Sequence, residues 1–185
     1  METEKKEELI NNVHKAFEGE NLIKTSFENI MAYLKTDEMP DRIIESIQEL
    51  LTDENWDELN DRFHANLAFG TGGMRGRTIG KTVTKAERGK KSPTGGPEFA
   101  AVGTSTLNEL TVIRATKALF IFIKQWMAEE GIHEQPRLVV AHDVRHFSVN
   151  FSDLVATEWT RMGGCAMKFD GPRSTPQLSF AVRSN

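Results

Sequence analysis

The stretch Arg137-Leu-Val-Val-Ala-His-Asp-Val-Arg-His-Phe-Ser148 decides the fold class, because a short apolar run leads directly into the start of a helix. Residues 137–141 are rich in apolar residues and short, which is typical of a buried strand. Ser148 is expected to cap a helix that ends before Gly163. A second strand is expected at residues 165–169. A strand, a helix and a second strand joined by short connections indicate parallel strands covered by helices.

The same pattern extends in both directions along the chain. Upstream, a long helix is predicted from Glu109 to about Glu130, with Asn108 as its cap. Its centre, residues 118–123, is apolar nearly all round, so we expect this helix to lie between layers. Downstream, a turn with two prolines leads to another helix over residues 177–183. The sequence therefore predicts an α/β fold, a three-layer α/β/α domain with a mixed, mostly parallel sheet.

The first third of the chain has a different composition. Residues 1–66 hold 7 basic and 17 acidic residues, net −10, whereas residues 67–185 hold 16 and 10, net +6. Apolar residues recur at helical spacing in four short segments of this acidic part. We interpret its charges as solvated faces and its apolar stripes as packing faces. We expect an acidic helical extension at 1–66 and an incomplete α/β/α domain at 67–185.

Composition and charge exclude several classes of protein. The chain has 185 residues and a net charge of −4, which argues against a nucleic-acid partner. It has no apolar run near the roughly 18 residues that cross a bilayer, and its N-terminus lacks the pattern of a signal peptide. Its single cysteine, Cys165, cannot form an internal disulfide and fits a reducing compartment. We therefore expect a cytoplasmic protein with no membrane partner.

The stretch Phe69-Gly-Thr-Gly-Gly-Met-Arg-Gly76 is the first candidate for chemistry. Its glycines let the backbone turn tightly and expose N–H groups. Thr71 adds a hydroxyl, and Arg75 adds a planar cation that can bind a phosphate or carboxylate through two hydrogen bonds. An ordinary tight turn with an arginine in solvent is the alternative. The spacing matches neither a P-loop nor a dinucleotide-binding turn.

A second candidate follows the strand at residues 137–141, where ligands bind in open α/β sheets. Asp143 and Arg145 are expected to pair and, with Ser148, to organise the loop. His142 and His146 could act as acid and base or as metal ligands, but no third ligand stands at metal spacing. A proline-flanked turn at residues 171–176 and a long polar loop from Lys81 to Thr106 are further candidates.

Four segments together resemble the α-D-phosphohexomutases, the family of phosphoglucomutase and phosphomannomutase. They are Leu67–Gly76, Asn108–Thr116, Val139–Ser148 and Arg173–Arg183, in family order. The resemblance implies an isomerase that moves a phosphoryl group between two hydroxyls of a sugar phosphate, using a phosphoserine and Mg²⁺. It places Thr71 and Arg75 in the active-site cleft as phosphate-binding residues, where Arg75 would hold either the phosphoserine loop or a substrate phosphate. It also implies a cytoplasmic enzyme of carbohydrate metabolism.

The family's phosphoserine loop and Asp-Gly-Asp-like metal motif do not occur in this sequence, which ends at Asn185. By resemblance we expect domain I of the family, truncated before the phosphoserine loop. Such a chain would contain no catalytic residue and no metal ligand, would bind no Mg²⁺ and would be inactive alone. Its partners would be the remaining domains of the polypeptide and, through an exposed sheet edge, a second copy.

Two other functions stay open at this point. The chain could be a non-catalytic module that binds phosphate or a sugar phosphate through residues 70–76 and the basic loop behind them. It could also be a scaffold whose acidic helices dock a partner, since fold and charge alone do not fix function.

Overall fold

The computed structural model describes residues 2–36, 39–70, 73–90 and 95–184. The chain forms two compact units, Met1–Asn108 and Glu109–Asn185. Residues 67–108 therefore belong to the same compact unit as the N-terminal helices. The sequence-based division at residues 66/67 concerns where a family domain begins, and it stays a prediction.

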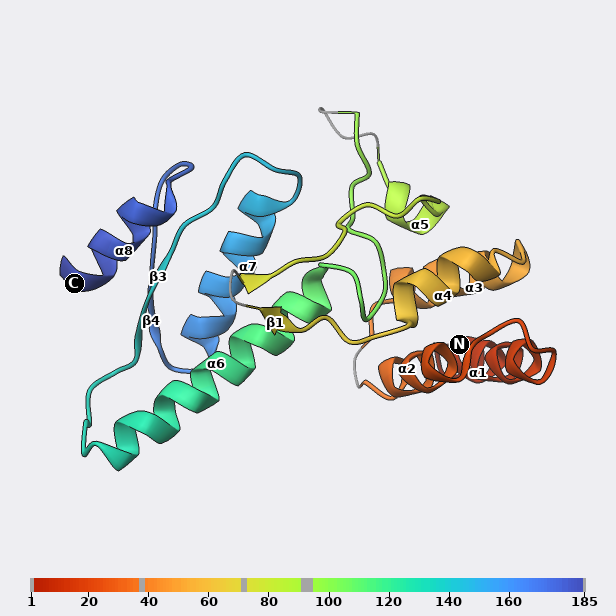
Figure 1. The fold of residues 1–185 in the computed structure, drawn as a ribbon, viewed down its shortest axis with the longest axis horizontal. Coiled ribbons are helices and arrows are strands. Elements are labelled where there is room, and N and C mark those ends of the chain that lie inside the picture. The colour runs from red at the N-terminus through yellow and green to blue at the C-terminus, as the bar shows by residue number, and fades with distance from the viewer. Residues whose placement is uncertain (1, 37–38, 71–72, 91–94, 185) are drawn as a thin grey trace. The chain divides into compact units, whose positions relative to one another are not determined.

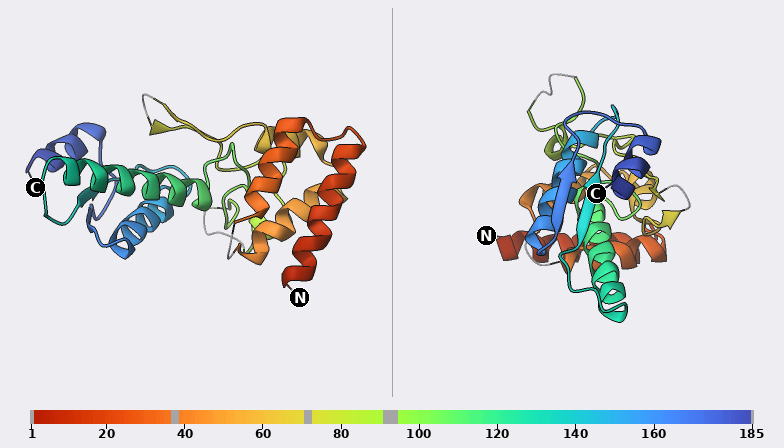
Figure 2. Two further views of the ribbon diagram at one scale, coloured as in Figure 1. Left: turned by 90° about the horizontal axis from the view of Figure 1, so that it is seen from below. Right: turned by 90° about the vertical axis from the view of Figure 1, so that its left-hand side faces the viewer.

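The first unit begins with a bundle of helices, shown in red and orange in Figures 1 and 2. The helices are α1 (Glu2–Glu18), α2 (Lys24–Leu34), α3 (Asp41–Thr52) and α4 (Trp56–Phe63). Each turns an apolar stripe inward, as the periodicity of the sequence predicted. The core of the bundle consists of fully buried side chains that include Leu9, Val13, Ile30, Ile47, Leu59 and Phe63.

The rest of the first unit has little regular structure. A short antiparallel hairpin pairs β1 (Phe69–Gly70) with β2 (Gly73–Met74). The loop predicted from Lys81 to Thr106 contains a one-turn helix, α5 (Lys85–Arg88). The side chain of Thr84 accepts from the backbone N–H of Glu87, and the Glu87 side chain accepts from the Thr84 N–H. This reciprocal cap explains why the chain turns helical here.

The second unit is an α/β arrangement. Its elements are α6 (Glu109–Glu129), β3 (Arg137–Val140), α7 (Ser148–Arg161), β4 (Cys165–Lys168) and α8 (Thr175–Ser184). Strands β3 and β4 are parallel, with Arg137 opposite Cys165 and Val140 opposite Lys168. Helix α7 packs against both strands and against α6, while α8 contacts β3. In Figure 1 the two strands run between α7 and α8. The predicted fold class, parallel strands with helices on both sides and further helices at the N-terminus, is confirmed.

The packing of α6 differs from the prediction. Phe120 on α6 meets the buried Trp159 of α7 edge to face, with ring centroids 5.0 Å apart. In contrast, Leu119, Ile121 and Phe122 are 45%, 55% and 63% exposed. Within the described residues α7 covers one side of α6, so the expectation that its apolar centre lies between two layers is wrong for this chain.

None of the helices in the described part of the chain has the length and hydropathy needed to cross a bilayer.

Candidate functional site

The glycine-rich stretch forms the β1–β2 hairpin of the first unit. Phe69 is opposite Met74 and Gly70 is opposite Gly73. Thr71 lies outside the described residues, so its predicted role stays untested. Arg75 follows β2 directly and its side chain is exposed, which leaves the guanidinium accessible to a ligand.

The chain on both sides of this hairpin is held by one neighbouring segment, residues 101–107. Leu67 N donates to Thr104 O at 2.7 Å, and Leu107 N donates to Arg77 O at 2.9 Å. Gly76 lies between these two contacts, and a Cβ there would stand 2.9 Å from Leu67 Cδ1 and 3.0 Å from Leu107 N. A larger residue at position 76 would therefore require Leu67 or the Leu107 backbone to move, and the chain that carries Arg75 is held on both sides of the hairpin.

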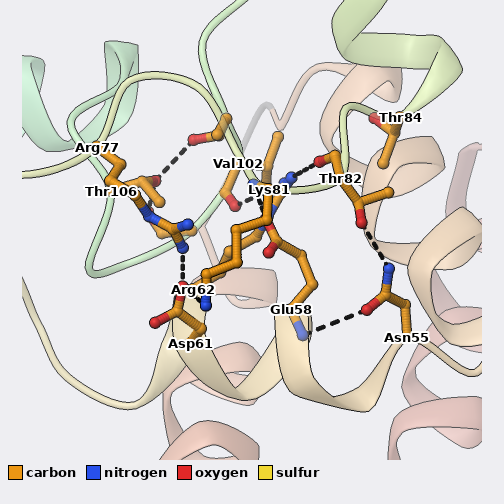
Figure 3. Close-up of polar contacts among 12 residues, drawn as sticks. Asn55, Glu58, Asp61, Arg62, Arg77, Lys81, Thr82, Thr84, Val102 and Thr106 are labelled. Carbon is orange, nitrogen blue, oxygen red and sulfur yellow. Dashed lines mark hydrogen bonds and ion pairs between the residues drawn. The ribbon is translucent and has the colours of Figure 1, made fainter.

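Three charged side chains lie buried behind this segment. We call Glu58, Arg62 and Glu87 the buried charge cluster; their exposed fractions are 2%, 0% and 1%. Arg62 Nε donates to Glu58 Oε1 at 2.7 Å, Arg62 Nη2 donates to Glu87 Oε2 at 3.2 Å, and Nη1 donates to Glu87 Oε1. Figure 3 shows Glu58 and Arg62 among their neighbours. The interpretation of the charges on the N-terminal helices as solvated is therefore wrong for Glu58 and Arg62.

Burial and ion pairing shift the pKa values of Arg62 and Glu87 in opposite directions. Burial by itself would lower the pKa of Arg62, but the hydrogen bonds and charges of Glu87 and then Glu58 raise that pKa above its ordinary value. Burial alone would raise the pKa of Glu87, but Arg62, the Val102 N–H and the Ser46 hydroxyl lower it below its ordinary value. Both Arg62 and Glu87 are thus ionised at neutral pH.

The second candidate, in the second unit, is the loop between β3 and α7. Asp143 accepts from the N–H and the Nε of Arg145, at 3.1 and 2.6 Å, and from the Ser148 hydroxyl at 2.5 Å. The structure thus brings Asp143, Arg145 and Ser148 together. The hydroxyl of Ser148, followed by the Arg145 N–H, lowers the pKa of Asp143 to about 2.

The position of Ser148 differs from the prediction by one residue. Phe147, in the left-handed region at φ 65°, is the cap residue, and no side chain caps the helix there. Ser148 is the first residue of α7 and its hydroxyl is used by Asp143. The serine therefore organises the loop and does not cap the helix.

The turn after β4 meets the same loop. Arg173 N donates to His142 O at 3.0 Å, which joins residues 171–176 to residues 141–148. His142 Nδ1 lies 2.9 Å from Asp143 O. Within the described ranges, no group of three His, Cys, Asp or Glu side chains could hold a metal ion, so the two histidines form no metal site with those residues.

Comparison with known proteins gives one family. Residues 100–185 match the family model of phosphoglucomutase/phosphomannomutase, alpha/beta/alpha domain I. The chain is 28% identical over 121 residues to a phosphoglucomutase of Staphylococcus haemolyticus, covering 65% of this chain and 17% of that protein. It is 26% identical over 157 residues to a phosphoribomutase of Saccharomyces cerevisiae, covering 83% and 21%. A phosphoglucomutase of Staphylococcus aureus is 25% identical over 127 residues, covering 69% and 18%.

The chain thus spans about a fifth of the length of the curated relatives it matches. No solved structure shows significant similarity to it.

Proposed function

We propose that this chain, whose residues 100–185 belong to alpha/beta/alpha domain I of the phosphoglucomutase/phosphomannomutase family, is the first part of an isomerase that moves a phosphoryl group within a sugar phosphate. The mutase names of the relatives support a phosphoryl transfer between hydroxyls of one sugar. The parent enzyme would act in the cytoplasm, where a chain with one cysteine in 185 residues stays reduced.

The observation that carries the proposal is the placement of Arg75. Its exposed guanidinium follows a glycine hairpin whose two ends are held by the segment 101–107. A guanidinium can offer two parallel N–H donors to phosphate oxygens, and a fixed backbone limits the ordering on binding to the Arg75 side chain itself. We assign the substrate phosphate to Arg75 and, from the sequence, to the Thr71 hydroxyl.

The loop of the second unit has a supporting role in this proposal. Asp143 accepts three hydrogen bonds from Arg145 and Ser148, which fix the loop after strand β3, and its pKa of about 2 makes it a weak base. We therefore keep Asp143, Arg145 and Ser148 as residues that organise the loop.

The Mg²⁺ of the proposed parent enzyme has no fitting set of ligands among the described residues. We place the metal and the phosphoserine in parts of the parent protein outside these 185 residues and assign no step to them here. It follows from the proposal that the 185-residue chain alone does not turn over glucose 1-phosphate. Turnover by the purified chain would contradict this.

Ligand-observed ³¹P NMR of glucose 1-phosphate tests the assignment of Arg75. We expect weak binding by this chain, with a dissociation constant of about 1 mM or above. Arg75→Met should weaken it by at least about tenfold, since a hydrogen bond to a charged group contributes about 1.5–3 kcal/mol and 1.4 kcal/mol is about tenfold. Arg88→Met, which removes an exposed arginine on α5, is the matched control and should bind like the wild type. Equal binding by all three proteins would refute the assignment.

The affinity also separates this proposal from its alternative, a non-catalytic module that binds phosphate or sugar phosphates. Dissociation constants in the micromolar range for this chain alone would favour the module, because a first domain shares its substrate contacts with others.

A second copy of the chain is a further proposed partner. Strands β3 and β4 form a two-stranded parallel sheet, and an open sheet edge presents backbone groups to which another strand can pair. Light scattering should show association that increases with concentration, and a monomer at high concentration would contradict it.

A further inference from the structure

We propose that Arg62 is a positioning residue for Arg75: it fastens to α4 residues 80–82, which follow the glycine hairpin along the chain, and residues 101–105, which hydrogen-bond to the chain on both sides of the hairpin. The inference rests on the proposed function, in which Arg75 binds the substrate phosphate. Arg62 itself touches no ligand in this account, because it is fully buried.

Both members of the Glu58–Arg62 pair hold the first of the two segments. Arg62 Nη2 donates to Thr82 O at 2.6 Å. Glu58 Oε1, which already accepts from Arg62 Nε, also accepts from Lys81 N at 3.1 Å. A Cβ on Gly80 would collide with Arg62 Nη2 and stand 2.5 Å from Glu58 Oε1. The backbone at residue 80 therefore lies directly on the buried pair, as the close-up in Figure 3 shows for Lys81 and Thr82.

The second segment is held by the same guanidinium and by its partner carboxylate. Arg62 Nη1 donates to Val102 O at 3.3 Å, and Val102 N donates to Glu87 Oε1 at 2.8 Å. The backbone of the same arginine takes part, because Ser105 N donates to Arg62 O at 3.0 Å. A single residue of α4 therefore contacts both segments.

The second segment and the residues just after it contact the chain on both sides of the hairpin, where Leu67 N donates to Thr104 O at 2.7 Å. Ala101 N donates to Thr78 O at 2.9 Å, and Leu107 N donates to Arg77 O at 2.9 Å. Arg77 also forms an ion pair with Asp61 of α4. A shift of residues 101–107 on α4 would move Arg77, two residues from Arg75, through the hydrogen bond from Leu107 N to Arg77 O.

The chemistry of the guanidinium explains why an arginine occupies this position. Its planar group offers donors in several fixed directions, and here they reach two carboxylates and two backbone carbonyls. A lysine would keep the charge but could not reach Glu58, Glu87, Thr82 and Val102 from one atom in the same geometry. Arg62→Lys therefore keeps the positive charge and tests the geometry of the guanidinium alone.

Two variants test the inference. The first is Arg62→Lys. The second, Glu58→Gln with Arg62→Met and Glu87→Gln, removes all three charges together and so leaves no buried charge without a partner. Arg88→Lys, an exposed substitution on α5, is the control. The measurements are hydrogen exchange, and the change of the Arg75 side-chain N–H signal in ¹H–¹⁵N spectra as inorganic phosphate is added.

We expect both variants to keep the protection of amides in α1–α3 and to lose protection by about tenfold or more at the N–H groups of Ala101 and Leu107. We also expect the phosphate dissociation constant read at Arg75 to rise by about tenfold, with Arg88→Lys unchanged. A purely structural role would not alter phosphate binding at Arg75 in a folded protein.

Three results would overturn the inference. In the first, both variants stay folded and keep the protection of the Ala101 and Leu107 amides. In the second, both stay folded and bind phosphate at Arg75 as tightly as the wild type. Alternatively, both could lose protection equally throughout the first unit, which would assign the cluster to overall stability. If phosphate fails to shift the Arg75 signal in the wild type, the proposed function fails, and the exchange of Ala101 and Leu107 still tests whether Arg62 fastens the two segments.

Discussion

Replacing Glu87 with glutamine removes one negative charge from the buried charge cluster and leaves the shape of the side chain unchanged. The carboxylate accepts from Arg62, from Ser46 Oγ at 2.9 Å and from Val102 N at 2.8 Å. A glutamine keeps one acceptor oxygen but places an N–H₂ group opposite other donors, such as Thr84 N at 3.2 Å. The variant therefore loses charge-assisted bonds and gains a contact between donors.

The loss of unfolding free energy in Glu87→Gln depends on Glu58, the carboxylate that still pairs with Arg62. Removing one partner of a buried ion pair costs about 3–5 kcal/mol. Since Glu58 Oε1 stays 2.7 Å from Arg62 Nε, the guanidinium keeps one counter-charge, and we expect about 3 kcal/mol, at the low end of that range. Glu45→Gln is the control, because this side chain is 54% exposed and forms a surface ion pair with Lys5. It should change the free energy of unfolding by under about 0.5 kcal/mol.

The dependence on pH provides a second readout for Glu87→Gln. The pKa of Glu87 is lower in the folded protein than its ordinary value of 4.5. The unfolded carboxyl thus binds a proton at a higher pH, so the stability from this group is complete above the unfolded pKa and is lost as the pH falls through the folded pKa. The wild type should lose stability as the pH falls below about 4.5, and the variant should lose less.

Hydrogen exchange of peptides from α1–α4, measured over a urea series at several pH values, reports the free energy of unfolding of the first unit. If Glu87→Gln matched Glu45→Gln in stability and the wild type in its pH dependence, the description of Glu87 as an ionised, buried partner would be refuted.

Other substitutions have equally direct outcomes. Gly80→Ala should destabilise the first unit by about 1–3 kcal/mol in urea denaturation, because its Cβ would overlap the buried charge cluster. Gly171→Ala, whose Cβ would come no closer than 3.4 Å to the nearest atom, should cost under about 0.5 kcal/mol. Trp159→Ala removes a side chain that is 1% exposed and should lower the unfolding free energy of the second unit by about 3–5 kcal/mol in the same assay. The pKa of Asp143, followed by carboxyl ¹³C NMR, should be about 2 and should rise toward 3.8 in Ser148→Ala; an unchanged value would show that the serine hydroxyl does not hold this carboxylate.

Local patterns predicted most of the elements. The helix from residue 109 is long and bounded by Asn108 and Gly131, and both strands of the second unit are short apolar runs between turn residues. The helix α5 was missed although Thr84 and Glu87 have the spacing of a capping box. That signal was present in the sequence, inside a segment that its polar composition marked as a loop.

The buried charge cluster could not be predicted from the periodicity of the first unit. Glu58 and Arg62 stand four residues apart on α4, which is equally typical of an exposed ion pair on a helix. Their burial depends on Glu87, 25 residues from Arg62 along the chain. Sequence patterns record local spacing. Whether a charged side chain on a helix is solvated or buried depends on a partner that is distant in sequence and that only the fold brings close.

The side-chain N–H signal of Arg75 provides the most direct test of the central claim, that this arginine binds a phosphate at the end of the glycine hairpin. In ¹H–¹⁵N spectra of the 185-residue chain, added glucose 1-phosphate should shift the Arg75 signal in a saturable way and leave that of the exposed control Arg88 unchanged. A shift at Arg88 as large as at Arg75, or no shift at Arg75 at millimolar ligand, would contradict the account.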